Sequence, residues 1–114
     1  MITTDTFRQI ALSLPEAVED AHFENRSFKV SKKIFATLNA KENRATLKLP
    51  AIDQDVFCAF DKTVVYPVPN KWGKQGWTHA NLLTVREEML IDLLKTAYRT
   101  VAPKKLGDLV IFEE

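Results

Sequence analysis

Apolar residues recur with two different periods along this chain of 114 residues. Near the N-terminus they are spaced three and four apart, which predicts a helix over residues 4–14 with one apolar stripe. That stripe consists of Phe7, Ile10, Ala11 and Leu14. Pro15 ends the predicted helix, because the residue before a proline is pushed out of the helical region.

Between residues 26 and 49, apolar and polar residues alternate instead. This pattern predicts three short strands, over residues 27–30, 33–38 and 45–49, joined by turns at 31–32 and 41–43. Alternation of this kind is typical of an antiparallel sheet with one dry and one wet face. The residues expected to face the core are Phe28, Val30, Ile34, Ala36, Leu38, Ala45, Leu47 and Leu49. Those expected to face water are Lys29, Thr37, Thr46 and Lys48.

The second half of the chain predicts a short helix over 53–60, a β-prone segment at 64–66 and a last strand near 77–82. A long apolar face then predicts a helix that starts near Thr84 and ends before Pro103. Thr84 and Glu87 have the spacing of a capping box. Residues 107–114 are expected to form a loose tail. The fold class is therefore α+β, one domain over residues 1–114, with an antiparallel sheet packed on one side by the N- and C-terminal helices.

Residues 71–78, called the Trp loop here, hold both tryptophans and two of the three glycines. The segment also carries Lys71, Lys74 and Gln75. A glycine-punctuated loop with flat side chains and cations is a candidate contact surface, because these residue types touch phosphates, sugars and base edges. Trp72 and Trp77 also have an alternative role, since tryptophan often anchors a loop to a core.

The charge is unevenly distributed, although the net charge is only +1. Residues 26–50 carry seven basic residues against Glu42 alone, whereas residues 1–25 are acidic. If the basic side chains converge, they form an anion-attracting patch; otherwise they line the wet face of the sheet as solvated charge. The candidate residues for nucleic-acid contact are Arg26, Lys29, Lys32, Lys33, Lys41, Arg44, Lys48, Lys71, Trp72, Lys74 and Gln75.

Other chemistry has little support in the sequence. His22 and His79 are far apart, no metal-ligand spacing occurs, and no nucleophile or phosphate-loop motif is present, so we expect neither a metal, a cofactor nor catalysis. The acidic run of Glu16, Glu19, Asp20 and Glu24 is expected to be solvated charge. No apolar run is long enough to span a membrane, and the N-terminus has no signal-peptide pattern. The single Cys58 suits a reducing compartment, so we expect a cytoplasmic monomer.

Several runs of sequence resemble the MmcQ/YjbR family of small bacterial proteins with a frataxin-like (CyaY-like) fold. They include residues 14–19, His22 with Phe23, residues 33–38, the Trp loop, and residues 97–106. The resemblance implies a "double wing" DNA-binding motif whose wings would be the hairpin turns near Lys32, Lys33, Lys41 and Arg44. Where the family often has glycine and then proline, this chain has Asn25 and Arg26. Frataxins bind iron on an acidic first helix. The predicted helix 4–14 has only Asp5 as an acidic residue, which argues against iron binding by this chain.

The first hypothesis is therefore a DNA-binding domain that contacts mainly phosphates. The alternative is an adaptor that binds a protein or small ligand through the loop between Trp72 and Trp77, with solubilising lysines. A third possibility is an enzyme whose site would place His22, His79 or Cys58 beside a carboxylate in a pocket.

Overall fold

The computed structural model describes residues 1–22 and 25–112 and has the element order expected of an α+β domain. Phe23, Glu24 and the last two residues of the chain lie outside the described residues. The helices are α1 (Thr4–Leu12), α2 (Ala51–Cys58), α3 (Lys71–Lys74), α4 (Glu87–Val101) and α5 (Lys104–Gly107). The strands are β1 (Val18–His22), β2 (Asn25–Val30), β3 (Lys33–Asn39), β4 (Arg44–Lys48), β5 (Val65–Pro67) and β6 (Trp77–Asn81).

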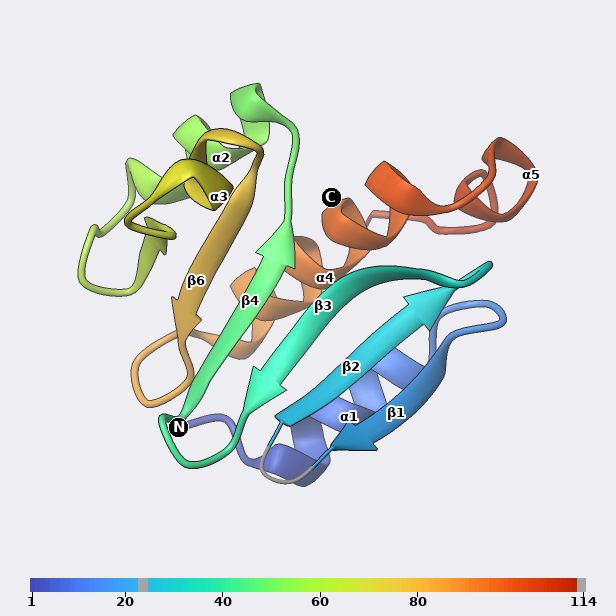
Figure 1. The fold of residues 1–114 in the computed structure, drawn as a ribbon, viewed down its shortest axis with the longest axis horizontal. Coiled ribbons are helices and arrows are strands. Elements are labelled where there is room, and N and C mark those ends of the chain that lie inside the picture. The colour runs from blue at the N-terminus through green and yellow to red at the C-terminus, as the bar shows by residue number, and fades with distance from the viewer. Residues whose placement is uncertain (23–24, 113–114) are drawn as a thin grey trace.

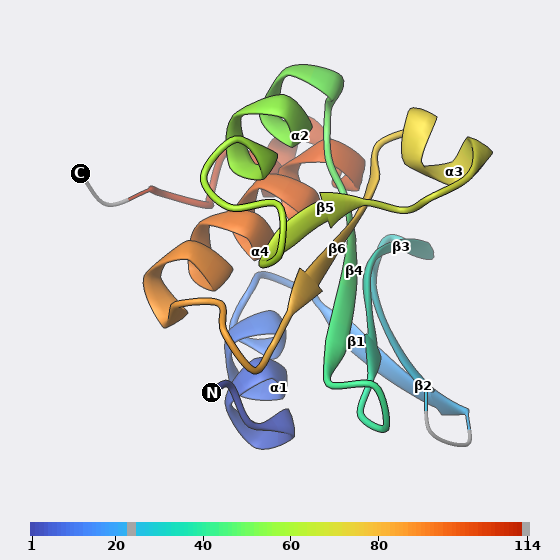
Figure 2. The ribbon, with the colours of Figure 1, turned by 90° about the vertical axis from the view of Figure 1, so that its left-hand side faces the viewer.

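The six strands form one antiparallel sheet in the order β1-β2-β3-β4-β6-β5. Helices α1 and α4 lie behind the sheet in Figure 1, and Figure 2 shows α1, α2 and α4 on one side of it. The short helix α3 stands on the opposite side. We call the side packed by α1 and α4 the covered face, and the other side the open face. The expected antiparallel sheet with helices on one side is confirmed.

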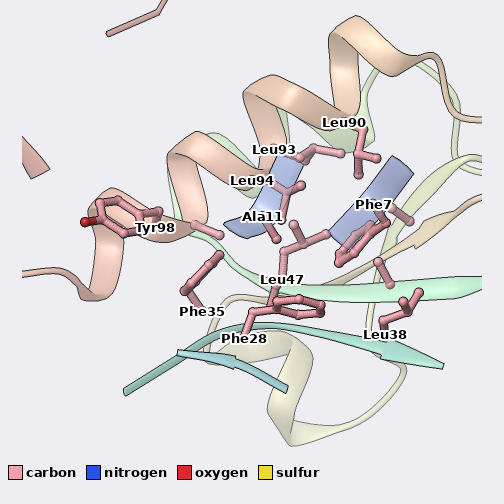
Figure 3. Packing of buried hydrophobic residues seen from close by; sticks show 14 of the residues in the cluster. Phe7, Ala11, Phe28, Phe35, Leu38, Leu47, Leu90, Leu93, Leu94 and Tyr98 are labelled. Atoms are coloured by element: carbon pink, nitrogen blue, oxygen red, sulfur yellow. The ribbon is translucent and has the colours of Figure 1, made fainter. Parts of the chain in front are cut away.

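The core fills the space between the covered face and the two long helices (Figure 3). Phe7 of α1 meets Phe28 of β2 edge to face, with ring centroids 5.4 Å apart. Phe35 of β3 meets Tyr98 of α4 in the same way at 5.5 Å. The Tyr98 hydroxyl also donates a hydrogen bond to the Pro15 carbonyl at 2.6 Å, which ties α4 to the segment after α1. These contacts fix which face of the sheet remains open.

Two local expectations about β3 and the start of α4 were wrong. Ile34 is 36% exposed and Phe35 takes the core position, because the β2–β3 register shifts at Phe28 and Lys29 and both Phe35 and Ala36 then face the helices. The capping box does not form: Thr84 and Val85 donate their backbone N–H groups to the Asn81 carbonyl, and this turn delays α4 until Glu87.

The acidic segment after α1 also differs from the expected solvated charge, because residues 18–22 form β1 beside β2 and the Glu19 side chain is largely buried between Arg8 and Arg26. Within the range expected as a loose tail, Val110 is buried and the Ile111 carbonyl accepts a hydrogen bond from Lys95. The described part of that range is thus docked against α4.

Candidate functional site

One row of side chains crosses the entire open face. Strand register places Ser27 opposite Thr37, Thr37 opposite Thr46, and Thr46 opposite His79. Asp20 extends the row to β1 and Tyr66 extends it to β5. Since residues paired across antiparallel strands point to the same face, these polar groups lie in line. The centre of the open face is therefore rich in hydroxyls.

A groove of about 320 Å³ lies over the middle of this row. Its lining combines sheet residues with residues of the segment from β5 to β6. The lining residues are Ile34, Thr37, Thr46, Val68, Trp72, Trp77 and His79. The groove is thus mostly apolar and aromatic at its sides, with hydroxyls and an imidazole on its floor.

His79 is held in place on the groove floor from two directions. Its Nδ1 lies 2.9 Å from the Thr46 hydroxyl oxygen, and its ring meets that of Tyr66 edge to face at 5.4 Å. Burial lowers the pKa of His79, and the positive charge of Arg44 lowers it further. The imidazole is therefore neutral at physiological pH and adds no charge to the floor.

The Trp loop is fixed to the sheet through its backbone. The Gln54 side-chain amide of α2 donates to the Gly73 carbonyl at 2.9 Å and to the Thr78 hydroxyl at 3.0 Å. A Cβ on Gly73 would lie 2.0 Å from the Val68 carbonyl oxygen, so only glycine permits this approach. Gly76 has a φ of 102° and lies equally close to Leu49. The loop is therefore a built support rather than a loose connection.

This support presents the two tryptophans differently. Trp72 is 49% exposed and stands on α3, whose first turn is capped by the Asn70 side chain at 2.9 Å. Trp77 is half-buried in β6, opposite Lys48. The Lys48 ammonium lies 5.5 Å from the centre of the Trp77 ring and donates to the Gln75 carbonyl. Trp77 therefore anchors the loop, while about half of Trp72 remains accessible.

The candidate basic residues fall into separate groups. Lys48, Lys71 and Lys74 lie at the end of the sheet that holds the groove, and the β2–β3 turn with Lys32 and Lys33 lies at that same end. At the opposite end are Lys41, in the β3–β4 turn, and Arg44, which pairs with Asn81. Figure 1 shows these two hairpin turns at opposite ends of β3. The structure thus divides the basic block instead of forming one continuous patch.

Two of the candidate residues are paired with acids. Arg26 lies opposite Leu38, on the covered face, where its guanidinium donates to Glu19 at 2.7 Å. Arg8 of α1 binds the same carboxylate at 2.9 Å. The hydrogen bond from Arg8 is the main reason why the pKa of Glu19 is lowered, and Arg26 adds to the effect. On the open face, Lys29 pairs with Asp20 at 2.6 Å.

Arg26 therefore does not belong to an open-face site, in contrast to the sequence-based expectation. Strand alternation in β2 places Arg26 on the covered face, and its guanidinium forms an ion pair with Glu19. Conversely, the sequence did not identify His79, Thr46, Thr37, Ile34 and Val68 as neighbours of Trp72. Strand alternation places Thr37 and Thr46 on the wet face, but only the β4–β6 register brings His79 beside them.

Cys58 shows no sign of activation. It lies buried at the end of α2, beside a surface hollow of about 400 Å³ that Asp55 and Lys62 also line. Burial raises the pKa of the thiol, and the Asp55 carboxylate raises it further, whereas a nucleophilic cysteine needs a lowered pKa. Among residues 1–22 and 25–112, no cluster of three His, Cys, Asp or Glu side chains could hold a metal ion. Within the same part of the chain, no helix has the length and apolarity to cross a bilayer.

Fold and groove together define a small α+β domain with one helix-covered and one open sheet face. A sequence-family model named YjbR matches residues 12–100. The chain therefore belongs to the YjbR family, which confirms the resemblance seen in the sequence. It is also similar to a crystal structure of the Deinococcus radiodurans protein DR2400, a DUF419 domain, with a TM-score of 0.78 and 25% identity over 92% of this chain and 82% of that chain. No curated protein matches.

Proposed function

We propose that this protein binds DNA through the groove end of the open face and catalyses no reaction. The observation that supports this most is the placement of Lys48, Lys71 and Lys74 around an aromatic groove with an uncharged floor. Lysines neutralise phosphates, and exposed aromatic rings contact bases. Lys32 and Lys33 extend the positive field at the same end of the sheet.

We further propose that the protein binds as a monomer. We also place it in the cytoplasm, where the lone Cys58 stays reduced. The absence of catalysis is part of the same proposal: the Cys58 thiol has a raised pKa, and its hollow does not include His79.

A titration of tryptophan emission with DNA tests the proposal. Single strands and duplexes, each about ten nucleotides or base pairs long, are added at 50 and at 200 mM salt. Binding through phosphates should weaken at least about tenfold between the two conditions, because each neutralised phosphate releases counterions. Binding that does not depend on salt, or no binding of either form at low salt, would refute the proposal.

A second candidate function is an adaptor that binds an apolar side chain or a small ligand. The observation in its favour is the apolar lining contributed by Ile34, Val68 and Trp77. Affinity for such a partner would change little with salt, whereas affinity for DNA would fall steeply. Replacing Lys71 and Lys74 by glutamine separates the two functions, since only DNA binding should lose affinity.

A further inference from the structure

The groove is a shallow, open hollow with a size that suits one aromatic ring. Its volume of about 320 Å³ is near the lower limit of pockets that hold small molecules. The exposed ring of Trp72 forms one side, and Ile34 and Val68 add apolar contacts. A base pair inside a duplex could not enter such a space, because both faces of each base are stacked on neighbours. An unpaired base could enter it edge first.

The floor of the groove favours a neutral, largely apolar occupant. The accessible lining is almost wholly apolar, and the Thr46 hydroxyl and His79 Nδ1 already contact each other at 2.9 Å. His79 is neutral for the reasons given above, so no residue of the floor carries a charge. A phosphate or a carboxylate would find no counter-charge on this floor, whereas the apolar face of an aromatic ring loses little on leaving water.

The charges that a strand of nucleic acid requires lie around the rim instead. The Lys71 ammonium lies 5.9 Å from the centre of the Trp72 ring, and the Lys48 ammonium lies 5.5 Å from the centre of the Trp77 ring. Lys48 uses one of its three N–H donors on the Gln75 carbonyl. Each tryptophan of the groove therefore has a lysine beside its ring, and these two cations are the candidates for contact with the phosphates that flank a base on Trp72.

We propose that the groove holds one unpaired base of a single-stranded nucleic acid, stacked on Trp72, with Lys48 and Lys71 at the flanking phosphates. This inference rests on the proposed function and narrows it from DNA in general to its single-stranded form. Stacking on an aromatic ring tolerates any base, so little sequence preference is expected. The Trp loop needs its rigid support for this role. A mobile Trp72 ring would have to be ordered on binding, and the lost conformational entropy would weaken the affinity.

The test compares Trp72→Ala and Trp72→Phe with Phe60→Ala. Phe60 is a matched control, because it is an aromatic residue of comparable exposure (70%) that lies outside the groove. The probes are a fluorescein-labelled oligothymidine of about ten nucleotides, the same backbone made of abasic units, and a duplex of equal length. Fluorescence anisotropy at low salt gives each affinity, and urea unfolding shows whether each variant is folded.

The single strand should bind more tightly than the duplex, and Trp72→Ala should weaken single-strand binding about tenfold. Trp72→Phe should retain most of the affinity, and Phe60→Ala should match the unmodified protein. On the abasic strand, Trp72→Ala should have no effect, because no base remains to stack. Equal loss on abasic and oligothymidine strands, or duplex binding as tight as single-strand binding, would overturn the inference and leave salt-dependent DNA binding intact. No binding of any probe at low salt would overturn both.

Discussion

Arg26 and Lys48 belong to the same sheet, in β2 and β4, but use their charges differently. On the covered face, Arg26 donates to Glu19, a carboxylate that Arg8 also binds. On the open face, the Lys48 ammonium donates a hydrogen bond to the Gln75 carbonyl and lies over the Trp77 ring. Neither group carries a negative charge that would neutralise the ammonium. A positive residue whose partner is an acid stabilises the fold, whereas one that keeps its net charge still attracts an anion.

The same contrast holds for the uncharged residues of the two faces. The covered face is filled by Phe28, Leu38 and Leu47, which are fully buried and packed against the helices. The open face carries Ser27, Thr37 and Thr46 in the equivalent register row. Hydroxyls are suited to contact with both water and ligand, so the open face can bind without exposing a large apolar surface. The comparison teaches that the alternating position of a residue in its strand decides whether it packs in the core or stays accessible on the open face.

The largest expected effect concerns two neighbouring residues of β4. Leu47→Ala should lower the free energy of unfolding by about 4 kcal/mol, because Leu47 is fully buried on the covered face and its loss leaves a cavity. Thr46→Ala, on the open face, should cost less than about 1 kcal/mol, the value of its contact with His79. Urea unfolding measures both. Equal costs would mean that the two faces are not packed differently.

Two glycines sharpen the comparison between the Trp loop and the rest of the fold. Gly76→Ala should cost about 3 kcal/mol, because Gly76 has a φ of 102° and the added Cβ would lie 2.1 Å from the Leu49 carbonyl oxygen. Gly107→Ala is the control, since its Cβ would meet Arg99 at an ordinary 3.9 Å. Thermal unfolding should show a clear drop for the first variant and almost none for the second. If Gly76→Ala unfolded at the same temperature as the unmodified protein, the Trp loop would have to move to accept the Cβ, and it would not be the rigid support inferred above.

The pH dependence of stability should depend on Glu19. Glu19→Gln should cost about 2 kcal/mol near neutral pH, because two arginines lose their carboxylate partner. The folded protein lowers the pKa of Glu19, so its contribution is present above the ordinary glutamate value and is lost as pH falls through the lower folded value. The difference between the two proteins should therefore shrink in urea titrations from about pH 5 downward. A difference that stays constant in acid would contradict the ion pair.

Sequence periodicity predicted the antiparallel strands, the first helix and the last helix, because each buries a regular apolar stripe. It missed β1, since the residues of β1 on the covered face are the charged Glu19 and the small, exposed Ala21, so no buried apolar stripe marks the strand. Only the partners Arg8 and Arg26, brought close by the fold, make the position of Glu19 favourable. Ile34 was misplaced because a bulge shifts the register by one residue, and the local pattern carries no sign of it.

The candidate site was only partly predictable for a similar reason. Trp72, Lys71 and Lys74 stand out as a composition cluster, so the sequence indicated them directly. The contact between Thr46 and His79 joins residues 33 positions apart, and it depends on which strands are neighbours. In the order β4-β6-β5, strand β6 lies between β4 and β5. The local sequence pattern of these strands does not indicate which of them are neighbours.

The smallest expected effect separates the two basic residues with which the comparison began. Lys48→Gln should reduce the slope of log affinity for DNA against log salt by nearly one unit, because one phosphate contact is lost. Arg26→Gln should leave that slope unchanged and instead lower the free energy of unfolding by about 1 kcal/mol, since Arg8 still holds Glu19. The measurement is anisotropy over a series of salt concentrations, paired with urea unfolding of both variants. If Arg26→Gln altered the slope as much as Lys48→Gln, nucleic acid would reach both faces, and the division of charge between fold and ligand would not hold.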